Sequence, residues 1–135
     1  MNKRTLLGLD VGEKWIGVAV ADTGVRIAVP LDTIVVDGGE VAAIAELVIR
    51  EQAATLVVGY PRNQQGQPTA QTKAVEQFVA QLENIDVSIV YQDESLTSVM
   101  AEDRLKSYGR PYTKADIDAQ AAAIILQDHL EQYYG

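Results

Sequence analysis

The fold of this chain follows from one stretch of its sequence, Leu7-Gly8-Leu9-Asp10-Val11-Gly12-Glu13-Lys14-Trp15-Ile16-Gly17-Val18-Ala19. Its first part belongs to an apolar run that predicts a strand over residues 5–10, ending at Asp10. Gly12 lies in the turn that follows, where a glycine is free to take positive φ. Its second part begins a strand over 15–22, in which small residues alternate with larger apolar ones. The small residues are Gly17, Ala19 and Ala21. Small side chains along one face predict that another element approaches that face closely.

A third strand is expected over 26–36, and it contains Pro30. Proline cannot donate a ladder hydrogen bond, which places this strand at an edge or a bulge. After residue 39 the apolar spacing becomes helical. The further expected elements are a helix over 39–53, a buried strand over 55–59, a helix over 69–83, a strand from Val87 that ends just before Asp93, a helix over 95–108 and a capped helix from Thr113 to about Tyr134. The chain therefore opens with an antiparallel meander, and the later alternation of strands and helices requires parallel pairing.

Length and composition predict a single α/β domain, residues 1–135, that uses no disulfides. Apolar residues make up 47% of the 135 residues, enough for a core at this size. The absence of Cys excludes thiolate catalysis and cysteine-bound zinc. The start of the chain lacks a signal-peptide pattern and no run of about 18 apolar residues occurs, so we expect a cytoplasmic protein without a membrane span. The net charge of −8 argues against broad nucleic-acid binding, although metal-binding carboxylates would explain part of it.

Three carboxylates stand at element ends that this topology can bring together. Asp10 ends the first strand, Glu94 follows the last strand, and Asp118 lies in the first turns of the last helix. The carboxyl ends of parallel strands form the usual site edge of an α/β sheet. Gathered carboxylates repel one another unless a cation intervenes, and oxygen ligands favour Mg²⁺ or Mn²⁺ over zinc. Two such ions would support phosphodiester hydrolysis without a nucleophilic side chain, although each aspartate taken singly is as readily a turn or cap residue.

Four blocks of sequence together resemble one known family, the pre-16S rRNA nucleases, which are also described as Holliday-junction-resolvase-like proteins. The blocks are the opening stretch 7–19, Val57-Val58-Gly59-Tyr60-Pro61 with Asn63 and Gly66, Asp93-Glu94-Ser95-Leu96-Thr97, and Asp118-Ala119-Gln120-Ala121-Ala122-Ala123-Ile124-Ile125-Leu126. This resemblance implies a ribonuclease H-like α/β fold: a five-stranded mixed sheet, three antiparallel strands followed by parallel ones, with helices on both faces. It also implies that Asp10, Glu94 and Asp118 are metal-binding catalytic acids, and that the protein matures the 5′ end of pre-16S rRNA in a bacterium.

The chain departs from the family pattern at two positions beside the expected site. The family usually carries a basic residue where this chain has Trp15, and again where it has Ser95. Positive charge at such positions would contact a phosphate backbone. The acids are intact, so the two departures bear on substrate affinity and on the rate.

Several basic and polar side chains near these blocks are candidates for binding nucleic acid. They are Lys14, Arg62, Asn63, Arg104, Lys106, Arg110 and Lys114. Residues 104–114 interleave basic and aromatic side chains, a mixture that can grip a backbone and stack bases. Ordinary alternatives exist for each candidate: a solvated turn lysine, a polar surface loop, and cations that complement the end of a helix.

Three other functions stay open at this point. Phosphotransferases of the actin-like or sugar-kinase type also open with a Gly-Asp-Gly-like hairpin that holds ATP phosphates, but they need two such lobes and this chain supplies one. A Holliday-junction DNA resolvase would normally act as a dimer, and the sequence leaves monomer or homodimer undecided. A non-catalytic RNA- or ribosome-binding module would keep the fold without turnover. The expected partner is nucleic acid, with pre-16S rRNA favoured over branched DNA.

Overall fold

The structure, a computed structural model, describes residues 4–61, 65–94 and 97–134. The elements follow the predicted order: β1 (Thr5–Val11), β2 (Trp15–Asp22), β3 (Val29–Val35), α1 (Glu40–Glu51), β4 (Ala53–Pro61), α2 (Ala70–Ala80), β5 (Ser88–Glu94), α3 (Thr97–Ser107) and α4 (Lys114–Tyr133). The main differences are at element ends, since β3 begins later than expected and β5 includes Asp93 and Glu94. None of the helices in the described part of the chain combines the length and apolar composition that a membrane span requires.

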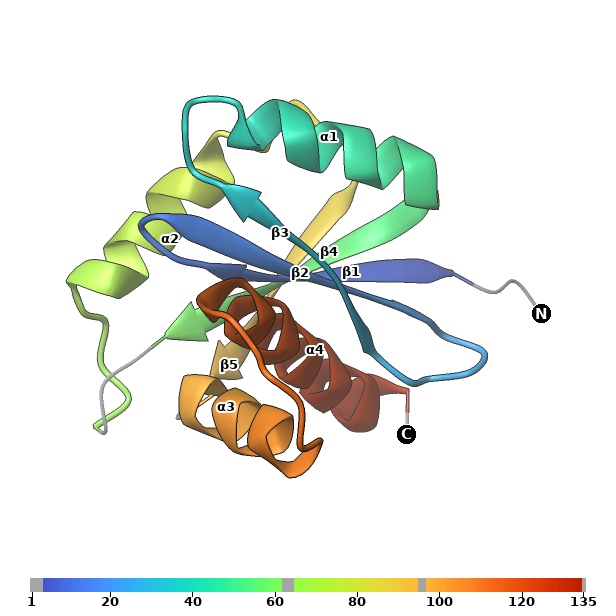
Figure 1. The fold of residues 1–135 in the computed structure, drawn as a ribbon. Helices are drawn as coiled ribbons and strands as arrows, with labels where there is room; N and C mark the ends of the chain where they lie inside the picture. Colours follow the sequence, from blue (N-terminus) through green and yellow to red (C-terminus); the bar gives the residue numbers. More distant parts are fainter. Residues whose placement is uncertain (1–3, 62–64, 95–96, 135) are drawn as a thin grey trace.

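All five strands belong to one mixed sheet with the order β3-β2-β1-β4-β5 (Figure 1). The pairs β1–β2 and β2–β3 are antiparallel, whereas β1–β4 and β4–β5 are parallel. Pro30 lies in the edge strand β3, at a register shift where it pairs with Ala19 while Asp32 pairs with Val18. The prediction that Pro30 marks an edge or a bulge is confirmed on both counts.

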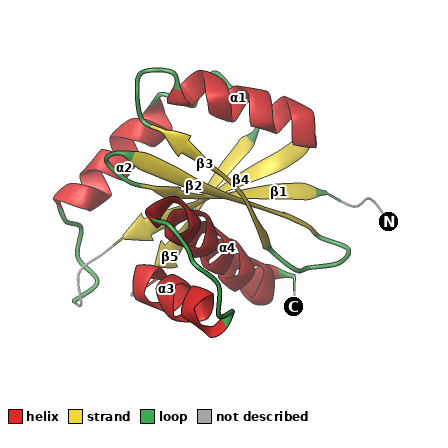
Figure 2. Cartoon of the chain, in the orientation of Figure 1, coloured by secondary structure: helices red, strands yellow, loops and turns green. Residues whose placement is uncertain are grey.

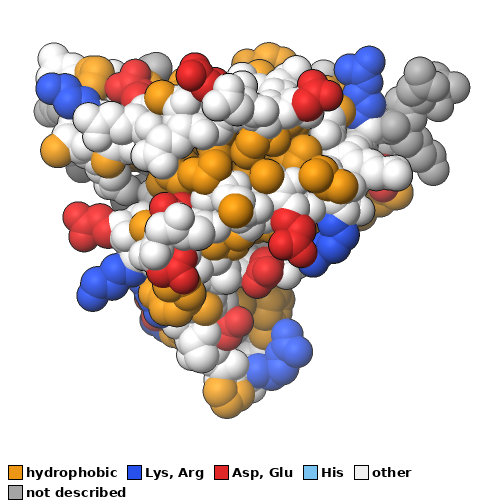
Figure 3. Space-filling view, turned by 90° about the horizontal axis from the view of Figure 1, so that it is seen from above, with side chains coloured by type: hydrophobic (Ala, Val, Ile, Leu, Met, Phe, Trp, Pro, Cys, Tyr) orange, Lys and Arg blue, Asp and Glu red, His pale blue; other side chains and the backbone are white. Residues whose placement is uncertain are grey.

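The helices form a layer on each face of the sheet (Figure 2). On one face, α1 and α2 cover a core that includes Leu7, Leu9, Ile16, Val18, Ile44, Leu56, Val58, Val75 and Phe78. On the other face, α4 packs against the sheet and α3 packs against α4. Figure 3 shows apolar side chains gathered at the centre of the face seen from above, with acidic and basic side chains mixed around its edge. The expected fold, a five-stranded mixed sheet with helices on both faces, is confirmed.

Helix α4 lies unusually close to the sheet because small residues face it. A Cβ added to Gly17 would stand 1.9 Å from the carbonyl oxygen of Asp118, and one added to Gly8 would stand 2.8 Å from Cβ of Leu126. Farther along β2, Ala19 and Ala21 pack under the same helix. The alternation of small and large residues in β2 therefore predicted this close approach correctly.

The helix also begins where its sequence indicated. The Thr113 hydroxyl accepts a hydrogen bond from the backbone N–H of Asp116, and the Asp116 carboxylate accepts one from the backbone N–H of Thr113. This reciprocal cap fixes the first turn of α4.

The expectation for Gly12 was wrong, because the described glycines with positive φ are Gly38, Gly66 and Gly109. The turn at Gly12 closes instead through a 3.0 Å hydrogen bond from its N–H to the carbonyl of Trp15.

The contact between Gly17 and α4 gives a first prediction. The substitution Gly17→Ala should destabilise the protein by about 1–3 kcal/mol or more, because the new methyl group meets rigid helix backbone rather than a movable side chain. Gly39→Ala is the matched control: its Cβ would meet only the Asp37 carboxylate at 3.3 Å, and it should cost less than about 1 kcal/mol. Urea denaturation of both variants measures the difference, and equal stability of the two would show that α4 is not held against β2 in this way.

Candidate functional site

Asp10 and Glu94 lie at the carboxyl ends of two parallel strands and on the same face of the sheet. Asp10 shares its face of β1 with Leu6 and Gly8, which contact α4. Strand β4 separates β1 from β5, and Gly59 of β4 lies between the two acids. A Cβ on Gly59 would stand 3.0 Å from Cδ and Oε1 of Glu94. The missing side chain at Gly59 therefore leaves the space through which Glu94 extends toward Asp10.

Asp118 reaches the same place from the first turns of α4. Gly17 is the cross-strand partner of Asp10, and the backbone of Asp118 rests directly on it. The side chain of Asp118 is buried, with 6% of the residue's surface exposed. Its Oδ1 atom accepts a hydrogen bond of 2.5 Å from Nζ of Lys114, one helical turn earlier. Two glycines on either side of β1 thus allow acids from three separate elements to meet.

The carboxylates are close enough to shift one another's protonation. Burial raises the pKa of Asp10 from 3.8 to about 6, and the negative charge of Asp118 adds to the rise while Lys114 opposes it. Burial also raises the pKa of Glu94, from 4.5 to about 7, with a contribution from Asp10. A hydrogen bond from Thr97 acts in the opposite direction on Glu94. Burial is the main cause of both rises, so at this spot the neutral form of each carboxyl is favoured unless a cation compensates the charge.

A cavity of about 540 Å³ opens beside Asp10 and Asp118. It is lined by Asp10, Val11, Gly12, Glu13, Lys14, Trp15, Gln71, Lys114 and Asp118. The sequence indicated Lys14 and Lys114 as neighbours of the acids, and both lie on the wall. Gln71 of α2 was missed, because nothing in its local sequence distinguishes it from other polar helix residues. Gly59 was also missed as a positioning residue, although a glycine at the end of an otherwise apolar strand was a usable signal.

In this conformation the three carboxylates are not positioned as ligands of one metal ion. In residues 4–61, 65–94 and 97–134, no group of three acidic or histidine side chains converges tightly enough to hold an ion. The ammonium group of Lys114 contacts Asp118 instead. Because the Lys114 side chain is 66% exposed, it is free to move into solvent.

The other predicted nucleic-acid-binding residues are dispersed. Burial and Glu131 raise the pKa of Asp128, and the charge of nearby Arg104 opposes that rise. Asp128 is ten residues along α4 from Asp118, about 15 Å along the helix. Lys106 is exposed in the last turn of α3. Arg110 lies in the loop between α3 and α4, over the ring of Tyr108. Arg62 and Asn63, like Ser95, fall outside the described residues. The structure thus brings Lys14 and Lys114 to the acids and places Arg104 elsewhere.

Comparisons with known proteins identify the family of this chain. Residues 4–132 match the sequence model of the RuvX family, described as Holliday junction resolvase. A protein of Chloroflexus aggregans named "Putative pre-16S rRNA nuclease" is 44% identical over 136 residues, which cover 97% of this chain and 96% of that protein. A protein of Gloeobacter violaceus with the same name is 45% identical over 130 residues, covering 94% of this chain and 83% of that protein.

Solved structures with low sequence identity share the fold. RuvC of T. thermophilus in complex with a Holliday junction substrate superimposes with a TM-score of 0.60 at 16% identity, covering 98% of this chain and 96% of RuvC. The Fowlpox virus resolvase bound to Holliday junction DNA gives a TM-score of 0.60 at 10% identity, covering 97% of this chain and 99% of the resolvase. The resemblance found in the sequence is therefore confirmed, and the chain belongs to the RuvX family, a nuclease family of ribonuclease H-like fold.

Proposed function

We propose that this protein is a divalent-metal-dependent nuclease in which Asp10, Glu94 and Asp118 hold Mg²⁺ or Mn²⁺ and carry out phosphodiester hydrolysis. One observation supports this most directly: acids from β1, β5 and α4 lie close enough to influence one another at the carboxyl edge of the sheet, and two of them, Asp10 and Asp118, line an open cavity. Burying carboxylates side by side costs free energy and needs a compensating cation. Binding of a metal ion would supply that cation and so account for the grouping of these carboxylates.

The residues present fit such ions by their chemistry. Carboxylate oxygens are the preferred ligands of Mg²⁺ and Mn²⁺, and the described chain offers no thiolate that would favour a softer metal. Bound divalent ions would supply an activated water and stabilise the leaving oxygen. Lys114 has to leave Asp118 for that carboxylate to become a ligand, and its exposed stem allows this. Released into the cavity, its ammonium group is then available for a substrate phosphate.

Other groups on the cavity wall suit a nucleic-acid strand. Lys14 and Lys114 lie on this wall and would contact backbone phosphates on either side of the scissile bond. Trp15 lines the same cavity, so a ring stands where the family usually has a basic residue. A ring there offers stacking to an unpaired base in place of a charge contact. This substitution favours single-stranded over continuous duplex substrate.

RNA is the favoured substrate, and the reason is the names of the curated relatives. Proteins at 40–45% identity are named for pre-16S rRNA, which supports a role in processing the 5′ end of that precursor in the bacterial cytoplasm. A branched-DNA substrate is the alternative, supported by the family's description and by the bound junctions of the structural neighbours. Family membership leaves no support for the phosphotransferase hypothesis.

The proposed role of Asp10 can be tested by cleavage. Wild type should cut end-labelled pre-16S rRNA in Mg²⁺ or Mn²⁺ but not in EDTA, and Asp10→Asn should lower the rate by more than about 100-fold, because even partners that only support metal ligands contribute 10–100-fold. Asp86→Asn is the control, since Asp86 is an exposed carboxylate in the turn before β5. Stronger cleavage of a four-way DNA junction would select the DNA alternative. Binding without any cleavage would favour a non-catalytic module.

The raised pKa values predict how pH affects stability. A carboxyl group whose pKa is higher in the folded state stabilises the fold at low pH and loses that contribution as pH rises through the folded pKa. The metal-free protein should therefore lose Tm as pH rises from the ordinary carboxyl range to about 7, the pKa of Glu94. Mg²⁺ should raise Tm more above this window than within it, and the pH dependence should be smaller in Asp10→Asn. Differential scanning calorimetry in EDTA and in Mg²⁺ measures this, and a Tm gain independent of pH would contradict it.

The contact between Lys114 and Asp118 predicts competition with the metal. Lys114→Gln should lower the Mg²⁺ concentration needed for half-maximal thermal stabilisation severalfold, while weakening RNA binding, because the ammonium group no longer occupies Asp118. Lys14→Gln is the matched control: Lys14 lines the same cavity without a hydrogen bond to the acids, so only RNA binding should fall. If both variants bind Mg²⁺ as wild type does, Lys114 does not compete for this site.

A further inference from the structure

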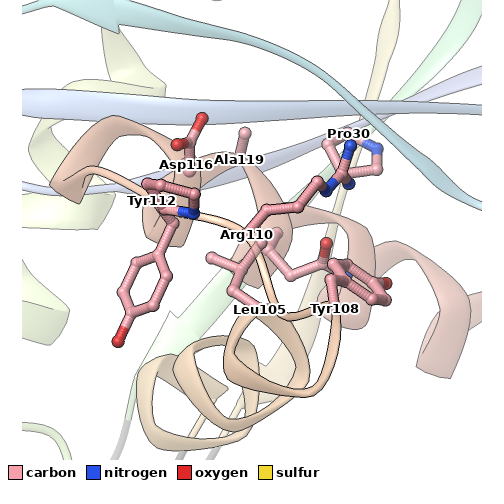
Figure 4. A pocket seen from close by; sticks show the side chains of 9 residues that line it. Pro30, Leu105, Tyr108, Arg110, Tyr112, Asp116 and Ala119 are labelled. Atoms are coloured by element: carbon pink, nitrogen blue, oxygen red, sulfur yellow. The ribbon is translucent and has the colours of Figure 1, made fainter.

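A second cavity, of about 500 Å³, lies on another side of the first turns of α4 (Figure 4). Lys114 and Asp118 are four residues apart and share the helix face that lines the acidic cavity. Asp116, Ala119 and Gln120 line the second cavity, and Gln120 is turned by about 200° around the helix from Asp118. The two cavities are therefore separated only by the width of α4.

The loop after α3 forms the outer wall of this cavity. Gly109 has a positive φ of 68°, a conformation that turns the chain sharply after Tyr108. As a result, the guanidinium carbon of Arg110 lies 5.7 Å from the centre of the Tyr108 ring. In Figure 4, Arg110 extends toward Pro30 of β3, and Leu105 and Tyr108 stand on the opposite side. The walls thus combine the Tyr108 ring and apolar side chains with the planar guanidinium group of Arg110.

Gln120 contributes a polar side chain to the lining of this cavity. Only 4% of its surface is exposed, and it lines this cavity. Its amide hydrogen-bonds to no other described residue, but its polar atoms reach solvent, since the fully enclosed side-chain polar atom without a partner in the described part of the chain is Nδ1 of His129. Asp116 adds a carboxylate beside it, of which Oδ2 accepts the N–H of Thr113 in the helix cap. The cavity lining thus includes an amide that is available to donate and accept hydrogen bonds with a ligand.

We propose that this cavity binds one nucleobase of the substrate strand, unstacked from its neighbours. A base is planar, so it can lie against Tyr108 and the Arg110 guanidinium, and its edge carries both donors and acceptors that suit the Gln120 amide. A strand whose scissile phosphate lies at Asp10 and Asp118 reaches the cavity within a few nucleotides, because only the helix separates the two. The inference rests on the proposed nuclease function and adds to it a position at which the enzyme reads its substrate.

Binding of oligonucleotides with single missing bases tests the proposal. The probe is a labelled single-stranded RNA of about 12 nucleotides, prepared as a set in which each member has one abasic position. Anisotropy is measured in Mg²⁺ with the protein in the Asp10→Asn background, so that the probe stays intact. One abasic position should weaken binding about tenfold, the usual contribution of a stacked base. Wild-type cleavage of the unmodified RNA is measured in parallel.

Three variants then assign that position to the cavity. Tyr108→Ala, Arg110→Lys and Gln120→Leu should each bind the complete RNA more weakly, and the abasic position should no longer matter to them. Arg110→Lys keeps the charge but loses the planar group, and Gln120→Leu keeps the volume, so its Tm should be unchanged or higher. Arg50→Ala removes an exposed cation of α1 that does not line the cavity, and it should keep the full abasic effect.

The outcomes are distinct. The proposal is overturned if no abasic position weakens binding, if the effect survives in Tyr108→Ala and Gln120→Leu, or if no RNA binds at all. It is also overturned if free nucleoside monophosphates bind wild type but not Gln120→Leu while the RNA set shows no abasic effect, because the cavity would then serve a free nucleotide. If the abasic effect is present and wild type cuts nothing, the base-binding site stands and the proposed catalytic function fails.

Discussion

The structure depends on the contact between the backbone of α4 and Gly17 of β2. With no side chain at Gly17, the helix comes so close to the sheet that the carbonyl of Asp118 rests on the strand beside Asp10. Any larger residue would lift the helix and carry Asp118 away from the edge of the sheet. Gly59 has the matching role on the other side of β1, where it leaves room for Glu94. Two missing side chains therefore decide where three carboxylates meet.

Gathering these acids costs the fold free energy that it has to recover elsewhere. Burial and mutual repulsion raise the pKa values of Asp10 and Glu94, so each carboxylate is less stable here than in water. Lys114 offsets part of this cost through its contact with Asp118. The alanine- and isoleucine-rich middle of α4 provides the apolar packing that holds the helix down despite the repulsion. The apolar packing of the middle of α4 thus compensates for the unfavourable grouping of carboxylates at its start, as is common at functional sites.

Much of the fold was predictable because local patterns determine it. The period-two alternation of small and larger residues in β2 indicated which residues face the helix, and Pro30 marked the edge strand by lacking a donor. The cap at Thr113 fixed the start of α4, and with it the place of Asp118 in the first turns. The placement of Arg104 was not predictable, because the basic stretch 104–114 is continuous in sequence but bends at Gly109. Arg104 lies on α3 before the bend, near Asp128 of α4, whereas Arg110 follows the bend and lies over the ring of Tyr108.

The sequence by itself determined the order of elements and the face of β2 that the last helix approaches, since these follow from periodicity, turn residues and caps. The choice of Asp10, Glu94 and Asp118 as the catalytic acids came from the family resemblance. Only the tertiary structure decided distances between elements remote in the chain. It placed the Glu94 side chain against Gly59 and brought the Lys114 ammonium group into contact with the Asp118 carboxylate. It also placed Gln120 in the lining of a separate cavity. Such contacts depend on how closely a helix packs on a sheet, and that closeness is set by the side chains of both at once.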